Sequence, residues 1–213
     1  MVKKCIVVLN GPSVTKINSF IEEQVRINAD MDTDMDTDMD TDMDTDMDTD
    51  MNYDLIACNR WVNVFEKIGL NAPNYVVVGK NSLDYNRQLM KRLPETVFYG
   101  IDRFSYSPAN YRLLKFGPVK VYGEKVDMKG ALWWTGLYAI QLALKKEYDE
   151  IHVFGFTCTD QPDYADTYMR TPIRQGNVNK IIHFLTELKN KGIMQKIHFH
   201  EDMNRHPFRD LIS

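Results

Sequence analysis

Short apolar blocks rich in β-branched residues alternate along this chain with longer segments that carry a helical pattern. The blocks that predict strands are 3–9, 54–58, 74–79, 95–99, 119–122, 150–155 and 195–199, and the segments that predict helices are 13–27, 60–68, 82–93, 130–146 and 174–191. This alternation is typical of α/β proteins with a mostly parallel sheet and helices on both faces. At 213 residues the chain is most simply one domain, 1–213.

A low-complexity insertion interrupts the alternation between the first helix and the second strand. Residues 30–50 read DMDTDMDTDMDTDMDTDMDTD, with Asp at every even position. In a strand the Asp side chains would share one face and repel one another, and Asp is a poor helix former. We therefore expect a solvated, flexible segment that buries almost nothing. Weak binding of divalent cations through the carboxylates is the alternative.

The insertion also hides the charge of the rest of the chain. The chain has 26 basic and 30 acidic residues, a net charge of −4, and eleven of the acidic residues are the Asp residues of 30–50. The other 19 acidic residues leave the rest of the chain at +7. A moderately basic body fits a ligand that carries phosphate or carboxylate. The basic residues are too few and too scattered to predict binding to nucleic acid.

Several features bear on the compartment of the protein. No window of eighteen apolar residues predicts a membrane span, and the N-terminal apolar block is too short for a signal peptide. The three cysteines, Cys5, Cys58 and Cys158, lack the spacing of a metal site. We expect a reduced, cytoplasmic protein in which Cys5 and Cys58 are small buried core residues. Whether it forms a homo-oligomer is open.

The first predicted strand ends in a corner with the sequence LNGPS, Leu9–Ser13. Gly11 permits a sharp turn and a close approach of a ligand, and Pro12 fits the first turn of a helix. Ser13 is expected to cap the helix start. Amide donors and the helix dipole suit this corner to a phosphate or another anion, and Asn10 is placed to hydrogen-bond a sugar or a base. An ordinary strand-to-helix turn is the alternative.

Polar residues follow the other predicted strands as well. Asn59 comes after 54–58, Lys80 and Asn81 come at the end of 74–79, and the region after 150–155 is rich in Asp, Thr and Tyr. Because the carboxyl ends of parallel strands share one edge, these residues are expected to meet there. Neutral amide groups suit sugars and bases, which need paired donors and acceptors.

Three segments, in order, resemble the small bacterial sialyltransferases that use CMP-sialic acid. They are LNGPS (9–13), ACNRW (57–61) and TGLYAIQLALKKEYDEIHVFGFTCTD (135–160). The resemblance implies a Rossmann-like single sheet, a lid at about 157–176, and transfer of a sugar from a CMP-activated donor to a glycan acceptor. It implies no metal and no cofactor beyond the nucleotide sugar.

The resemblance also implies roles for individual residues. Asn10 and Ser13 would contact the phosphate or ribose of the donor, and Asn59 would contact the nucleotide sugar. Thr135 and Gly136 stand where the family has a Ser-Gly pair near the sialic acid carboxylate. The remaining candidates for nucleotide-sugar binding are Gly11, Lys80, Asn81, and the lid residues Tyr164 and Tyr168, which would steady the departing phosphate.

The chain departs from the family at the catalytic base. The family has a His in the lid before the last long helix, and the matching position here lies near Pro172 or Ile173. Neither side chain accepts a proton. The nearest ionisable replacements are Asp160, Asp163 and Asp166, one of which would act as the base.

A second resemblance leads to a different chemistry. The Gly-Pro-Ser corner and the segment NAPNYVVVGKNSLD (71–84) are similar to the hydroxymethylpterin diphosphokinase-like proteins, which have an Asp where this chain has Lys80. A nucleotide-binding protein without catalysis is the third reading.

Overall fold

The computed structural model of the protein describes the segments that form its sheet and most of its helices. The described residues are 2–9, 11–32, 53–58, 65, 68–78, 83–100, 109, 111–113, 119–121, 124–126, 135–156, 175–202, 204 and 206–212.

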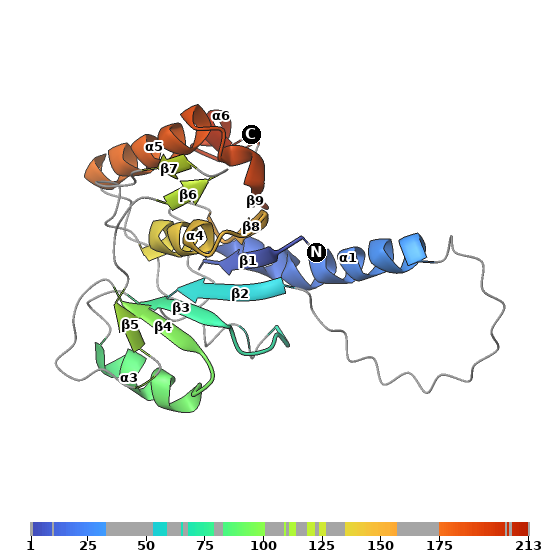
Figure 1. Ribbon diagram of the computed structural model, residues 1–213, viewed down its shortest axis with the longest axis vertical. Coiled ribbons are helices and arrows are strands. Elements are labelled where there is room, and N and C mark those ends of the chain that lie inside the picture. The colour runs from blue at the N-terminus through green and yellow to red at the C-terminus, as the bar shows by residue number, and fades with distance from the viewer. Residues whose placement is uncertain are drawn as a thin grey trace.

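Seven parallel strands form the central sheet, in the order β5-β4-β3-β2-β1-β8-β9 (Figure 1). Their bounds are Lys4–Val8 (β1), Tyr53–Cys58 (β2), Tyr75–Val78 (β3), Val97–Gly100 (β4), Tyr111–Leu113 (β5), Glu150–Phe154 (β8) and Ile197–Phe199 (β9). The predicted α/β fold with a parallel sheet is confirmed, and it is Rossmann-like.

The order of the strands reverses at β1. From β1 the chain builds β2 to β5 on one side, and then returns to place β8 on the other side of β1, in register from Lys4↔Glu150 to Val8↔Phe154. The point between β1 and β8 is therefore a topological switch point. In open parallel sheets ligands bind there, outside the carboxyl ends of the strands.

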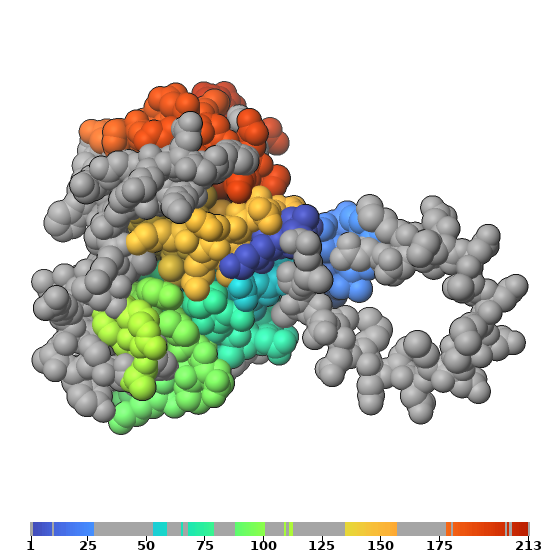
Figure 2. Space-filling model, viewed as in Figure 1, coloured from blue at the N-terminus to red at the C-terminus, as the bar shows by residue number. Residues whose placement is uncertain are grey.

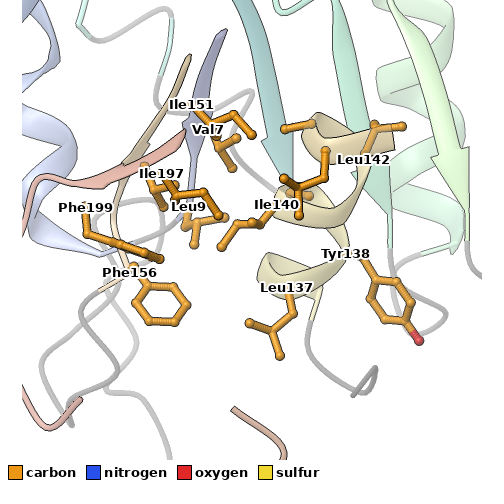
Figure 3. Packing of buried hydrophobic residues seen from close by; sticks show 14 of the residues in the cluster. Val7, Leu9, Leu137, Tyr138, Ile140, Leu142, Ile151, Phe156, Ile197 and Phe199 are labelled. Atoms are coloured by element: carbon orange, nitrogen blue, oxygen red, sulfur yellow. The ribbon is translucent and has the colours of Figure 1, made fainter. Parts of the chain in front are cut away.

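Apolar side chains cover both faces of the sheet, as the β-branched blocks predict. On one face α4 (Thr135–Lys145), α5 (Gln175–Asn190) and α6 (Arg209–Ile212) share an apolar cluster with alternate residues of β1, β2, β8 and β9. Figure 3 shows the part of this cluster around α4. On the other face the helical segment Pro12–Lys16 (η1), α1 (Ile17–Asp32) and α3 (Leu83–Arg92) pack against the intervening residues. In Figure 2, α5 and α6 lie at one end of the molecule and β4 at the other, with α4 between them.

The first helical region is longer than the sequence pattern predicts. It begins at Pro12, as expected, and α1 continues to Asp32, beyond the predicted end at residue 27 and into the first Asp-Met-Asp of the repeat. The prediction that the helix stops before the repeat is wrong. Residues 33–50, most of the insertion 30–50, lie outside the described residues, between α1 and β2.

Short elements account for the other differences from prediction. Val119–Val121 (β6) is not a strand of the main sheet, because it pairs antiparallel with Glu124–Val126 (β7). The edge position is taken by β5, which the sequence did not reveal, and α6 and the short turn Met194–Lys196 (η3) were also missed. Of the predicted helix 60–68 only residues 65 and 68 are described, and of the predicted helix 130–146 the structure describes α4 and residue 146.

Cys5 and Cys58 are buried in β1 and β2, which confirms their prediction as core residues. Burial raises the pKa of the Cys5 thiol, so this side chain is held in its neutral form. Among the helices of the described segments, none has both the length and the apolar character that crossing a bilayer requires.

Candidate functional site at the switch point

The backbone pairing of β1 and β8 continues past the ends of both strands. The Leu9 N–H donates to the Phe154 carbonyl at 2.8 Å, and the Gly11 N–H donates to the Gly155 carbonyl at 3.1 Å. These bonds bring the LNGPS corner beside the residues that follow β8, although more than 140 positions separate them in the sequence. The backbone after β1 and the backbone after β8 are therefore hydrogen-bonded side by side at the switch point.

The close approach of these two backbone segments requires a glycine at position 155. Its φ of +81° lies in the region that side chains rarely adopt, and a Cβ at this position would lie 2.7 Å from the Leu9 carbonyl carbon and oxygen and 2.8 Å from the Gly11 nitrogen. Gly11, in contrast, has φ −75° and ψ 166°, which any residue adopts. The prediction that Gly11 supplies the unusual turn is therefore wrong, and that role belongs to Gly155.

Ser13 and Glu201 tie three segments together at the switch point. The Gly155 N–H donates to the Ser13 hydroxyl oxygen at 2.6 Å, and the Ser13 hydroxyl donates to Glu201 Oε1 at 2.6 Å. The same Oε1 accepts the N–H of Phe156 at 2.7 Å. We call these four residues, Ser13, Gly155, Phe156 and Glu201, the switch-point cluster. It joins η1, the end of β8 and the chain after β9.

Ser13 does not act as the predicted cap of the helix start. Gly11 occupies the N-cap position of η1, with no side-chain capping hydrogen bond, so the predicted cap is wrong. The Val14 N–H bonds the Gly11 carbonyl at 3.3 Å, and the Ser13 hydroxyl is engaged by Glu201. Within the corner, the Gly11 and Val14 N–H groups and the Ser13 hydroxyl thus donate to acceptors of the protein itself.

His206 forms a hydrogen bond to Phe156 of the switch-point cluster. This buried side chain accepts the Phe208 N–H at Nδ1, 3.2 Å away, which places its proton on Nε2. The Nε2–H then donates to the Phe156 carbonyl at 2.7 Å. Phe156 is therefore held on both sides, through its N–H by Glu201 and through its carbonyl by His206.

The start of α4 reaches the same edge of the sheet. Only residues 146–149 separate the end of α4 from β8, so α4 runs antiparallel to the strands and begins at their carboxyl ends. Leu137 of its first turn belongs to the same apolar cluster as Leu9 and Phe156 (Figure 3). The predicted site residues Thr135, half-buried, and Gly136, buried, thus lie at the edge that carries the switch-point cluster.

A line of hydrogen-bonded ionisable side chains lies on the α1 face of β8 and β9. Lys4 pairs with Glu150 at 2.9 Å, His152 Nε2 lies 3.0 Å from Glu150 Oε1, and His152 Nδ1 lies 2.9 Å from His200 Nε2. Because a carboxylate only accepts, His152 donates to Glu150 and accepts from His200. The rings of Phe154 and Phe20 pack against His200. We call Glu150, His152 and His200 the imidazole line.

The environment keeps both imidazoles neutral. Burial lowers the pKa of His152 to about 4, against the opposing effect of Glu150, and burial together with His152 lowers the pKa of His200 to about 4. Burial would raise the pKa of Glu150, but the Lys4 ammonium outweighs it and the pKa is lowered. Glu150 is therefore an anion between a cation and two neutral rings.

Most of the residues that the sequence nominated for the site cannot be compared with the structure. Asn10, Asn59, Lys80, Asn81, Tyr164, Tyr168 and the three candidate bases Asp160, Asp163 and Asp166 lie outside the described residues, as do 157–174 of the predicted lid. Gly11, Ser13, Thr135 and Gly136 are described, and all lie at the carboxyl-end edge of the sheet.

Glu201 and Gly155 were not among the nominated residues. A glycine at the last position of the predicted strand 150–155 was a usable signal for Gly155. Nothing local marked Glu201, because its partners lie 188 and 45 residues away. Among the described side chains, no group of three or more His, Cys, Asp or Glu is arranged to hold a metal ion.

Comparison with known proteins gives one distant likeness. No family model matches the chain, and no curated protein matches it. Among solved structures, thiamine pyrophosphokinase from Bacillus subtilis is similar at a TM-score of 0.41 and 15% sequence identity. The match covers 92% of this chain and 60% of that one, so this chain spans less than two thirds of that protein's length.

Proposed function

We propose that the protein is a nucleotide-sugar-dependent transferase that binds a CMP-activated sugar at the carboxyl-end edge of β1 and β8 and transfers the sugar to a glycan acceptor. The observation that carries the proposal is the meeting of two segments that resemble the sialyltransferases. In LNGPS (9–13), Leu9 bonds Phe154 at the end of β8, and Gly11 and Ser13 bond Gly155, directly at the switch point.

The start of α4 gives further support. Thr135 and Gly136, which stand at the Ser-Gly pair of that family, begin a helix at the same edge of the sheet. A ligand over the switch point would therefore meet the η1 corner on one side of the sheet and the α4 start on the other. In this proposal Ser13 and its neighbours hold the nucleotide portion, Thr135 contacts the sugar, and one of Asp160, Asp163 and Asp166 takes the proton of the acceptor hydroxyl.

A ligand panel tests this proposal. Calorimetry with CMP, CMP-sialic acid and ATP with magnesium, each titrated separately, is expected to give the tightest binding for the two cytidine ligands without added metal. Slow release of CMP from CMP-sialic acid, or transfer to an acceptor, would then distinguish an enzyme from a binding protein. Binding of the cytidine ligands without any turnover would favour the non-catalytic reading.

The alternative is diphosphoryl transfer. It is favoured by the segment 71–84, which resembles the hydroxymethylpterin diphosphokinase-like proteins and follows the Gly-Pro-Ser corner. In that chemistry the substrate is ATP with its magnesium ion, so binding of ATP that strictly requires magnesium, with no response to CMP, would replace the first proposal by this one.

A further inference from the structure

Glu201 is the residue that closes the switch-point cluster. It lies in the chain directly after β9. One of its two carboxylate oxygens, Oε1, accepts both the Ser13 hydroxyl at 2.6 Å and the Phe156 N–H at 2.7 Å. Hydrogen bonds to a carboxylate are stronger than those between neutral groups. One side chain thus joins the first helical turn to the end of β8.

The carboxylate also fixes the orientation of the Ser13 hydroxyl. Because Glu201 only accepts, the hydroxyl proton points to Oε1, and a lone pair of the hydroxyl oxygen receives the Gly155 N–H at 2.6 Å. Without the carboxylate the hydroxyl rotor would be free to turn, and the Phe156 N–H would lose its acceptor. Ser13 is 8% exposed, so few water molecules can replace the lost partner.

We propose that Glu201 is a positioning residue of the nucleotide site, which holds Ser13 and the Gly155–Phe156 backbone in the arrangement that receives the ligand. The inference rests on the proposed function, because it assigns the ligand to the switch point. Glu201 acts through Ser13 and Phe156 and does not itself contact the nucleotide. Its amide analogue keeps an acceptor oxygen at the same place, so Glu201→Gln preserves the geometry that Glu201→Ala removes.

The test combines binding with a readout that needs no ligand. Affinity for CMP is measured by calorimetry for wild type, Glu201→Ala, Glu201→Gln and a control, Glu187→Ala, which removes a carboxylate paired with Lys191 on the outer side of α5. Amide hydrogen exchange at Gly155 and Phe156 is followed by NMR in the same proteins, and urea unfolding shows whether each variant is folded.

We expect Glu201→Ala to weaken CMP binding about tenfold, which corresponds to the loss of a net hydrogen bond to a charged group. The Gly155 and Phe156 amides should exchange faster in this variant. Glu201→Gln should bind CMP within about threefold of wild type, and Glu187→Ala should match wild type. In the double variant with Ser13→Ala the two losses should not add, because both act on one network.

Three outcomes overturn the proposal. They are CMP binding by Glu201→Ala as tight as or tighter than wild type, Glu201→Gln as weak as Glu201→Ala, and unchanged exchange of the Gly155 and Phe156 amides. If wild type binds none of CMP, CMP-sialic acid and ATP with magnesium, the proposed function fails. The amide exchange rates then test independently whether Glu201 holds the Gly155–Phe156 backbone. Faster exchange in Glu201→Ala alone would then still support its role in holding the corner.

Discussion

The two faces of β8 are both buried but are stabilised in different ways. Ile151 and Val153 point to the α4 and α5 side, are fully buried and belong to the large apolar core cluster. On the α1 side His152 is also buried, at 5% exposure, but it lies in a line of hydrogen bonds with Glu150 and His200. A strand of this kind is usually apolar on both faces.

Burial alone therefore does not determine how the stability of a sheet face depends on pH. The apolar face depends on contact area and packing, which do not change with pH. The polar face depends on one order of donors and acceptors, and that order requires His152 to be neutral, because its Nδ1 accepts from His200. The two faces should therefore be separable by substitution and by pH.

The largest loss of stability is expected from a substitution at Gly155, directly after β8. Gly155→Ala would force a Cβ to within 2.7 Å of the Leu9 backbone at a φ of +81°, and backbone atoms on both sides cannot move apart cheaply. We expect the free energy of unfolding to fall by about 4 kcal/mol. Urea denaturation measures this loss.

Gly192 offers a matched control for that substitution. It has a similar φ of +67°, and a Cβ there would meet nothing within 4 Å. Gly192→Ala should therefore cost only the conformational strain, about 1 kcal/mol. Equal losses for the two variants would show that the close approach at Gly155 is unimportant.

The next effect concerns the apolar face. Ile151→Ala removes buried methyl and methylene groups from a close-packed cluster and should lower the free energy of unfolding by about 3 kcal/mol. Because no titratable group is involved, the loss should be the same at pH 7 and pH 5. A loss that shrinks or grows markedly with pH would contradict the separation of the two faces.

The polar face should make stability depend on pH. The pKa values of His152 and His200 are lowered to about 4 in the folded protein, below the value of about 6.5 in the unfolded chain. The unfolded state therefore binds more protons, so the contribution is complete above pH 6.5 and is lost as the pH falls toward 4. The urea midpoint should decline between pH 7 and pH 5.

Most of the charged and titratable groups near His152 and His200 oppose the protonation of these two side chains. His198 and Lys4 help to lower the pKa of His152, His198 and Lys16 help to lower that of His200, and among these described groups Glu150 acts in the opposite direction on His152. His198→Gln should keep most of the pH dependence, because this side chain is exposed at the edge. A urea midpoint that stays constant between pH 7 and pH 5 would show that the line is not coupled to folding.

The smallest effect is expected at a buried polar group that has no such partners. Gln141 in α4 is 1% exposed, and neither its amide oxygen nor its amide nitrogen has a hydrogen-bond partner among the described residues. Gln141→Met keeps the length of the side chain and removes the unsatisfied amide, so stability should rise by about 1 kcal/mol. A lower melting temperature would show that the amide has a role that the apolar side chain cannot fill.

The sequence predicted the parts of the molecule that depend on local pattern. The apolar blocks at 3–9 and 150–155 gave two adjacent strands, and Pro12 marked the start of a helical segment. The parts that depend on tertiary contact escaped it. β5 is three residues long, and the role of Glu201 arises only when β9 lies beside β8. Ser13 was correctly assigned to the corner, but its partners were not foreseeable from neighbouring residues.

The position of β1 in the sheet has a consequence for how the chain assembles. β1 pairs with β2 on one side, Lys4↔Tyr53, and with β8 on the other, Lys4↔Glu150. During synthesis the second edge of β1 therefore stays without its partner until about 145 further residues have been made. Such distant pairing slows folding and leaves an apolar strand edge open to other chains. β1, an interior strand of the finished sheet, is thus the one that waits longest for its second partner, and nascent chains that stop before β8 should be the species most in need of a chaperone.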